Sequence, residues 1–341
     1  MSPRTPAAPG YSLRMLLKGL VLILLATGFA RVSASEFRAG DPPYAEREAV
    51  QVFIQEQVAA GRDRETLETL FAATDPQQRI LDLISSPAEA RPWKDYRPIF
   101  VTEQRIRGGR DFMNTQGKWL ERAEDRFEVE AEIIAAIIGV ETYYGRHTGG
   151  FRVFDALVTL GFDYPPRADF FRKELGEFLA LVDEEDLDPR GTRGSYAGAM
   201  GRGQFIASSY RHYAVDFDGD GRRDLLNSWP DAIGSVANYF REHRWNYGEP
   251  VVARARVEGD LHEALPGRNL QARLSLDELA DHGIYPDEPV DADGRYSFIR
   301  LQGEEGFEYF LGYPNFYVIT RYNRSPLYAM AVHQLAEALA D

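Results

Sequence analysis

Glu141 is the residue whose sequence surroundings point most directly to acid chemistry. It closes the apolar stretch Ile137-Ile-Gly-Val-Glu141, and at helical spacing Ile134, Ile138 and Glu141 lie in one row. A carboxyl group there is poorly solvated, which raises its pKa and lets it donate a proton near neutral pH. Cleavage of a glycosidic bond needs such a donor for the leaving oxygen. Taken alone, the segment would more often hold a helix-end glutamate that faces water or forms an ion pair.

A glycine-rich segment follows about fifty residues later. It spans 191–203, with glycines at 191, 194, 198, 201 and 203, and contains Ser195-Tyr-Ala-Gly-Ala-Met-Gly-Arg-Gly-Gln-Phe205. Such a segment lets the backbone approach a ligand closely, but it could equally be a flexible connection.

The segment Asp216-Phe-Asp-Gly-Asp-Gly-Arg-Arg-Asp224 has the oxygen spacing of an EF-hand-like calcium loop. Asp216, Asp218 and Asp220 would supply carboxylates, and Arg222 would supply its carbonyl. The twelfth position is Asn227 and not the usual glutamate, so the next carboxylate is Asp231 at the sixteenth position. The alternative is a solvated acidic turn.

Polar and aromatic residues interrupt an apolar stretch at 318–328, just before the last predicted helix. Asn323 offers donors and an acceptor, which suits a sugar amide or hydroxyl. It could equally cap a helix or a turn.

The remaining pattern predicts helices in most of the chain and strands only near its end. Helical periodicity is found at 44–60, 64–73, 77–84, 117–126, 128–142, 167–184, 228–243 and 328–340. Short alternating segments at 251–257, 296–301 and 308–311 predict a small β-rich insertion.

The motifs, in this order, resemble those of the lytic murein transglycosylase B family, glycoside hydrolase family 103. The resemblance rests on Gly139-Val-Glu-Thr142, Gly198 to Phe205, the Asp216 loop, Asp231 to Tyr239, and Thr320 to Tyr328, and it extends from Tyr44 to the C-terminus. It implies a mainly α (α+β) fold, with a lysozyme-like catalytic core, an α-helical domain and a small β-rich insertion. The expected divisions are a signal peptide at 1–34, an α-helical region at 35–127, the catalytic core with the calcium loop at 128–249, the β-rich insertion at 250–313, and a helix completing the core at 314–341.

The resemblance also implies the reaction and the site. The family cleaves the β-1,4 bond between N-acetylmuramic acid and N-acetylglucosamine in peptidoglycan without water and leaves 1,6-anhydromuramoyl ends. Glu141 matches its single acid and base. The positions matching the glycan groove are Ser195, Gln204, Tyr239, Tyr322, Asn323 and Tyr328, with Tyr96 and Arg167 added for sugar and stem-peptide contacts. Those matching the calcium site are Asp216, Asp218, Asp220, Arg222 and Asp231. Calcium would be structural, and no organic cofactor is expected. The loop carries one extra residue before Asp231, which is a departure from the family.

The N-terminus and the composition predict export to the periplasm. Arg4, Arg14 and Lys18 precede an apolar run at 19–30, and Val32-Ser-Ala34 suits cleavage after Ala34. An uncleaved anchor is the alternative. The chain has no cysteine, which excludes disulfides and a Cys-linked lipid anchor. Removal of residues 1–34 changes the net charge from −14 to −18, which argues against nucleic-acid binding. We expect a monomer that binds peptidoglycan strands, with cell-wall synthesis or remodelling proteins as possible partners.

Two other functions compete with the transglycosylase hypothesis. A hydrolytic muramidase would use the same acid with a positioned water and would give reducing ends in place of anhydro ends. A non-catalytic peptidoglycan-binding or calcium-responsive scaffold protein would show a degraded acid position, whereas Glu141 is intact.

Overall fold

The structure is a computed structural model that describes residues 42–85, 91–265 and 270–341. The predicted signal peptide, residues 1–34, lies outside the described residues and stays a prediction. Within the described part of the chain, no helix combines the length and the apolar character needed to cross a membrane.

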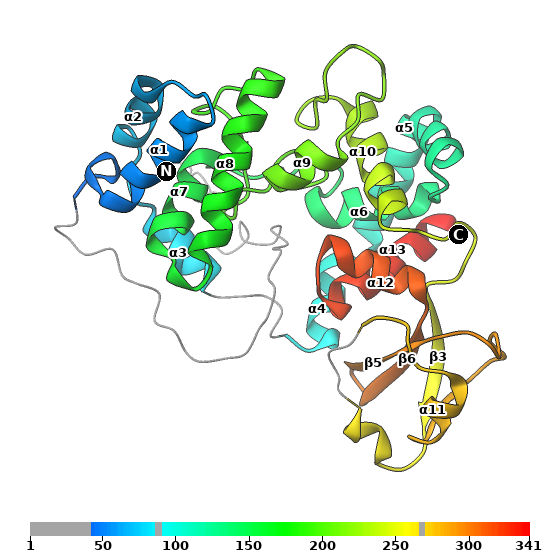
Figure 1. Ribbon diagram of the computed structural model, residues 1–341. Coiled ribbons are helices and arrows are strands. Elements are labelled where there is room, and N and C mark those ends of the chain that lie inside the picture. Colours follow the sequence, from blue (N-terminus) through cyan, green and yellow to red (C-terminus); the bar gives the residue numbers. More distant parts are fainter. Residues whose placement is uncertain (1–41, 86–90, 266–269) are drawn as a thin grey trace, which may run out of the picture.

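Five helices form one lobe, at the upper left of Figure 1. They are α1 (Glu48–Ala59), α2 (Arg64–Ala72), α3 (Gln78–Ile84), α7 (Val153–Asp163) and α8 (Ala168–Glu185), with the short 3-10 helices η1 (Tyr44–Glu46) and η3 (Pro165–Arg167). Aromatic rings join the early and late helices of this lobe. The rings of Phe71 and Phe154, for example, meet edge to face with centroids 5.3 Å apart.

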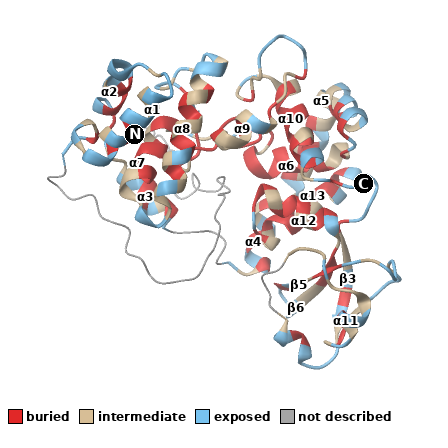
Figure 2. Ribbon diagram, in the orientation of Figure 1, coloured by how far each residue is buried: buried red, intermediate tan, exposed pale blue. Residues whose placement is uncertain are grey.

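A second group of helices surrounds α6, which carries Glu141. Its members are α4 (Trp93–Phe100), α5 (Glu103–Phe127), α6 (Ala131–Thr142), α9 (Ala207–Tyr213), α10 (Trp229–Glu242), α12 (Pro314–Tyr322) and α13 (Pro326–Ala340). Every residue from Ile133 to Thr142 is buried, and α6 packs against α5, α10 and α13. In Figure 2 much of α6 and of the neighbouring α12 is coloured as buried. The sequence predicted an apolar row on this helix, but α6 is apolar on all sides because neighbours enclose it.

A four-stranded antiparallel sheet extends below α12 and α4 in Figure 1. The strand order is β4-β3-β6-β5, formed by β3 (Val252–Val257), β4 (Ile284–Pro286), β5 (Ser297–Gln302) and β6 (Phe307–Gly312), with α11 (Leu276–Ala280) and η4 (Leu261–Ala264) beside it. Ile299, Leu301 and Phe310 join the main core, whereas Leu311 and Tyr296 belong to a separate small core. A mainly α protein with a small β-rich insertion is therefore confirmed.

The packing does not follow the predicted division at 127/128. Residues 35–127 were expected to form one helical region, but α1 to α3 lie with α7 and α8, whereas α5 packs against α6 and α10. Helix α5 also begins at Glu103, far before the predicted 117–126 segment. Gly108 and Gly109, which lower helix propensity, lie in the part that the periodicity missed. A Cβ at Gly109 would lie 2.3 Å from the Tyr144 hydroxyl, so close packing explains the glycine.

Candidate active site

Glu141 lies in the last turn of α6 and is almost enclosed. Its exposed fraction is 5%. Its Oε1 accepts a hydrogen bond of 2.6 Å from the hydroxyl of Tyr328, which is itself fully buried in α13. Glu141 forms no ion pair with any described Lys, Arg or His. The carboxyl group is thus held by one neutral donor in an otherwise apolar core.

This environment changes the acidity of Glu141. Burial raises its pKa from 4.5 to about 8, and the Tyr328 hydrogen bond opposes the shift. Burial, followed by the nearby Glu141, raises the pKa of both Tyr328 and Tyr322 well above the ordinary value. The two phenols therefore stay neutral, and Glu141 holds its proton at neutral pH.

The end of α6 is tied to the glycine-rich segment. The Thr142 hydroxyl donates to the Arg202 carbonyl at 2.9 Å and accepts the Gly145 N–H at 3.0 Å. Tyr143 follows with a φ of 53°, so the helix ends in a left-handed turn. The carbonyl of Gly139, one turn earlier, accepts a 2.9 Å hydrogen bond from the buried Arg105 guanidinium. These contacts fix the position of Glu141 relative to residues 191–203.

The glycine-rich segment is a packed turn rather than a flexible connection. β2 (Arg193–Gly194) pairs with β1 (Phe151–Arg152), and Met200 bridges to Phe205. Gly201 has a φ of 71°, and a Cβ there would lie 2.4 Å from the Leu225 carbonyl oxygen. Composition alone allowed a flexible connection at 191–203, and the close packing of the segment excludes it.

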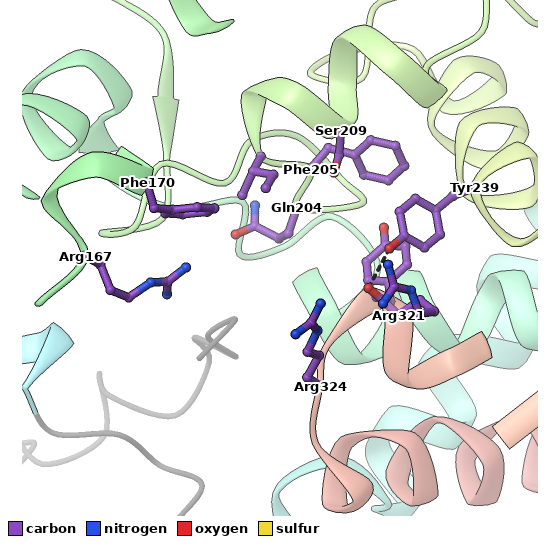
Figure 3. A pocket seen from close by; sticks show the side chains of 10 residues that line it. Arg167, Phe170, Gln204, Phe205, Ser209, Tyr239, Arg321 and Arg324 are labelled. Atoms are coloured by element: carbon purple, nitrogen blue, oxygen red, sulfur yellow. Dashed lines mark hydrogen bonds between the residues drawn. The ribbon is translucent and has the colours of Figure 1, made fainter. Parts of the chain in front are cut away.

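Four of the predicted groove residues line one pocket next to this segment (Figure 3). They are Arg167 at the end of η3, Gln204, Tyr239 of α10 and Tyr322 of α12. The Tyr322 hydroxyl donates to the Gly203 carbonyl at 2.5 Å, and the Tyr239 hydroxyl donates to the Arg321 carbonyl at 2.6 Å. The Glu141 charge acts on Tyr322, so this lining residue of the pocket is close to the carboxyl group.

The other predicted groove residues lie elsewhere. Ser195 is fully buried, and its Oγ accepts the Ala199 N–H at 3.0 Å, so it holds the glycine-rich turn. Tyr96 is buried in α4 and stacks on Trp93, with ring centroids 6.4 Å apart. Asn323 is buried at the junction of α12 and α13. The side chain that caps α13 is Ser325, which accepts the Tyr328 N–H at 3.3 Å.

Sequence reasoning missed two residues of the pocket. Arg321 and Arg324 both line it. Both stand in the segment 318–328, immediately beside Tyr322 and Asn323, and that adjacency was the available signal.

Three carboxylates meet in the Asp216 loop. Asp216, Asp218 and Asp231 each place one oxygen within 4.8 Å of the others. None of the three forms an ion pair with a described Lys or Arg, and the neighbouring Arg223 pairs with Glu184 and Glu185. Burial raises the pKa of Asp231, backbone hydrogen bonds lower it, and the Asp218 charge raises it further. Uncompensated carboxylates at this spacing fit a hard cation with oxygen ligands.

Asp220 is not a member of this cluster. Its Oδ1 accepts the Arg222 N–H at 2.9 Å. Asp231 lies at the start of α10, where Oδ1 accepts the Phe217 N–H and Oδ2 the Asp224 N–H, both at 2.8 Å. The fold therefore adds the Asp231 carboxylate, from α10, to the two loop carboxylates. The twelve-residue spacing of an EF-hand-like loop does not include a ligand at this position.

The sequence profile of the transglycosylase SLT domain matches residues 45–337. The chain belongs to the transglycosylase SLT family. The membrane-bound lytic murein transglycosylase B of Escherichia coli is 41% identical over 310 residues, which cover 87% of this chain and 84% of that protein.

Solved structures of lytic transglycosylases share the fold of this transglycosylase. SltB1 of Pseudomonas aeruginosa has a TM-score of 0.82 and 51% identity, and the match covers 87% of this chain and 98% of SltB1. Slt35 of Escherichia coli in complex with calcium has a TM-score of 0.78 and 42% identity, over 87% and 93% of the two chains. SltB3 of Pseudomonas aeruginosa in complex with NAG-anhNAM-pentapeptide has a TM-score of 0.75 and 32% identity, over 85% and 78%.

These relationships establish the activity. The transglycosylase is a lyase that cleaves peptidoglycan, as the predicted family implied. The lysozyme-like core predicted from the motifs is confirmed as well.

Proposed function

We propose that Glu141 is the single acid and base of this transglycosylase, which cleaves the β-1,4 bond between N-acetylmuramic acid and N-acetylglucosamine without water. The observation that carries the proposal is the enclosed Glu141 carboxyl, with Tyr328 as its donor and a pKa raised to about 8. An acid of this kind is protonated before the reaction and can ionise during it.

In the first step Glu141 gives its proton to the glycosidic oxygen of the leaving N-acetylglucosamine. Tyr328 donates to Oε1, and Oε2 accepts no hydrogen bond from the described residues, so Oε2 is the oxygen proposed to carry the proton. As the C–O bond breaks, positive charge develops on the muramic acid ring. The substrate's own acetamido carbonyl would stabilise that charge, in place of the second carboxylate of ordinary glycosidases.

In the second step the Glu141 carboxylate takes the proton from the C6 hydroxyl of the muramic acid. The C6 oxygen then bonds to C1, which closes the 1,6-anhydro ring and returns the proton to Glu141. One carboxyl group thus serves both steps, and no water is consumed.

The glycan contacts are proposed for the residues that face the pocket. Tyr239 and Tyr322 offer ring surfaces for sugars, Gln204 offers an amide beside the glycine-rich turn, and Arg167 offers a cation for the stem peptide. Ser195, Tyr96 and Asn323 remain proposed groove positions. Ser195 would act by holding the turn, because its hydroxyl is already used by the backbone.

We further propose that Asp216, Asp218 and Asp231 hold a calcium ion, with the Arg222 carbonyl as an additional ligand and Asp220 outside the inner set. The relative Slt35 has been solved in complex with calcium. Bound calcium would neutralise the three carboxylates and stiffen the loop between α9 and α10. Its role is structural, because the loop residues do not line the pocket beside Tyr322.

The place of action that we propose is the periplasm, reached by a signal peptide cleaved after Ala34. The support is the sequence pattern of residues 1–34 and the peptidoglycan substrate. The E. coli relative is named membrane-bound, whereas this chain has no cysteine that could carry a lipid.

Mass spectrometry of the soluble products from purified peptidoglycan tests the reaction. We expect muropeptides with anhydro ends, lighter by one water than the hydrolytic products. Products with reducing ends would show that the protein acts as a muramidase. A folded, calcium-supplied protein that releases no products would favour the scaffold hypothesis.

A further inference from the structure

The residues that follow Glu141 adopt a backbone conformation that few side chains tolerate. Tyr143, Tyr144 and Gly145 have φ values of 53°, 56° and 79°, so three successive residues lie in the left-handed region. Glycine adopts this region freely, whereas each tyrosine there raises the free energy of the fold. Such conformations persist only where neighbouring groups hold them, and they are concentrated at functional sites. The contacts of this left-handed turn, residues 143–145, therefore affect the acid beside it.

Arg105 of α5 is the buried cation at the left-handed turn. It is 7% exposed, and no described Asp or Glu forms an ion pair with it. A guanidinium keeps its charge when buried, and a buried charge needs compensation. The Arg105 guanidinium carbon lies 4.8 Å from the centroid of the Tyr143 ring and 5.2 Å from that of Phe100. These ring faces, together with the negative end of the α6 dipole, compensate the charge.

The hydrogen bond of Arg105 reaches the main chain of the helix that carries the acid. Its Nη1 donates to the carbonyl of Gly139 at 2.9 Å, two residues before Glu141. The same carbonyl accepts the N–H of Tyr143 at 3.0 Å. One carbonyl oxygen thus joins α5 to both the end of α6 and the first residue of the left-handed turn.

Tyr144 holds the turn from a second position. Its ring stacks on Phe112 of α5, with centroids 5.5 Å apart. A Cβ at Gly109 would lie 2.3 Å from the Tyr144 hydroxyl oxygen, and a Cβ at Gly139 would lie 2.7 Å from it. The ring therefore fills space that two glycines leave between α5 and α6. The Arg105 charge also acts on Tyr144, so the two side chains hold one turn together.

The turn can affect the reaction only through the end of α6. Glu141 and Thr142 are the last two residues of that helix, so the position of the turn determines where the carboxyl group lies. Arg105 does not line the pocket beside Tyr322, and its charge is not a cause of the raised pKa of Glu141. The titratable groups linked to that carboxyl are Tyr322 of α12 and Tyr328 of α13. Arg105 thus acts through the backbone.

We infer that Arg105 is a positioning residue for the cleavage reaction, which holds the left-handed turn against α5 and so fixes the Glu141 carboxyl group and keeps water away from it. This inference rests on the proposed function, because it takes Glu141 as the acid. Displacement of a reacting group by about 1 Å can reduce a rate by about 100-fold, so a residue that touches no substrate can have a large effect.

The test is the variant Arg105→Met, which removes the charge and the donors but keeps a long unbranched side chain. Initial rates on a soluble oligosaccharide of alternating N-acetylglucosamine and N-acetylmuramic acid give kcat and KM. We expect kcat to fall by about 10- to 100-fold and KM to change by less than about twofold, because Arg105 contacts no substrate.

Infrared titration of the Glu141 carboxyl in the same variant gives a second measurement. The raised pKa of Glu141 is caused by burial. A loosened turn admits water, and water stabilises the ionised form. The band of the protonated acid should therefore disappear at a lower pH in Arg105→Met than in the unmutated protein.

Three further variants separate positioning from stability. Arg105→Lys keeps the charge without the planar donors and should recover part of kcat. Phe71→Leu, at a fully buried position in the other lobe, should lower the melting temperature but leave kcat and the Glu141 titration unchanged. Arg107→Gln removes an exposed arginine of α5 and should change none of these quantities. Circular dichroism melting of each variant measures its stability, and if Arg105→Met melts below the assay temperature, Arg105→Lys supplies the same comparison.

A folded Arg105→Met protein with the unmutated kcat would overturn the inference, as would a loss of activity that lies wholly in KM. Failure of the proposed function is a separate outcome. An active Glu141→Gln protein would remove Glu141 from the mechanism, whereas the infrared titration reports whether Arg105 controls the carboxyl group whichever reaction follows.

Discussion

Carboxylates occur in two opposite environments in this protein. Glu141 stands alone in the core, 5% exposed, with one tyrosine hydroxyl as its partner. Asp216, Asp218 and Asp231 converge on one point at the edge of the molecule, where Asp218 is exposed and only Asp231 is fully buried. The first site removes water from a single acid, and the second concentrates negative charge.

Each environment determines what its site requires to be stable. A lone carboxyl without a cation avoids the cost of burial by keeping its proton, so it becomes an acid that works near neutral pH. Three neighbouring carboxylates cannot all be relieved in this way while two remain accessible to water, so a cation is the natural partner. We therefore expect a proton to control the site at Glu141 and a metal ion to control the cluster of Asp216, Asp218 and Asp231.

The largest effect is expected at the lone acid. Glu141→Gln removes the proton donor while preserving shape, and we expect the rate of peptidoglycan cleavage to fall by at least about 1,000-fold. The measurement is the release of soluble muropeptides over time. Glu132→Gln, in the first turn of the same helix and only partly buried, is the matched control and should stay close to the unmutated rate. An active Glu141→Gln protein would remove Glu141 from the mechanism.

The same substitution should also change how stability depends on pH. The folded protein holds the Glu141 proton up to about pH 8, whereas the unfolded chain loses it near 4.5. Because the folded state binds more protons in this window, the free energy of unfolding falls as the pH rises, by at most about 1.4 kcal/mol per pH unit. The glutamine of Glu141→Gln does not titrate, so the free energy of unfolding of this variant lacks the decrease. Relative to the unmutated protein, the variant should therefore gain stability as the pH rises toward 8. Urea unfolding curves of both proteins measure the difference, and a constant difference would contradict the raised pKa.

At the cluster of Asp216, Asp218 and Asp231, we expect substitution to reduce the stability of the fold. Asp231→Asn leaves one of the two backbone N–H groups from Phe217 and Asp224 without its acceptor, which should cost about 2 kcal/mol. We expect calcium to raise the melting temperature of the unmutated protein, and Asp231→Asn should abolish that rise. Asp220→Asn, exposed and outside the cluster, should change stability by less than about 0.5 kcal/mol and keep the calcium response. Loss of the calcium response in Asp220→Asn would instead favour the loop ligands predicted from the sequence.

The smallest effect is expected from Tyr328→Phe. It removes the hydrogen bond to Glu141 that lowers the pKa of this acid, so the pKa should rise and the alkaline limb of the pH–rate profile should move to higher pH. Loss of one orienting hydrogen bond should reduce the rate by about tenfold. Tyr313→Phe, whose ring contacts Tyr296 instead, is the control. An unmoved alkaline limb would mean that Tyr328 does not influence the acid.

Local patterns in the sequence predicted much of this arrangement, and long-range contacts account for the rest. The apolar neighbours of Glu141 are within one helix, so spacing alone indicated a poorly solvated carboxyl. Its partner Tyr328 lies 187 residues away, and no periodicity connects the two. At the loop, the regular spacing also included Asp220, whereas the cluster in the structure consists of Asp216, Asp218 and Asp231, the last of which the family motif had named.

The pocket was predicted less completely than the acid. Aromatic and amide residues matched motif positions of the family, but no motif or spacing singled out Arg324. Arg324 and Arg167 line one pocket only because η3 and the α12–α13 connection come together in the fold.

Infrared difference spectroscopy of the protein across neutral pH, with Glu141→Gln as the reference, shows directly whether the buried carboxyl group holds its proton. The structure predicts a protonated carboxylic acid band at neutral pH that titrates near pH 8 and is missing from the variant. A Glu141 carboxyl already ionised at neutral pH would contradict its role as the proton donor.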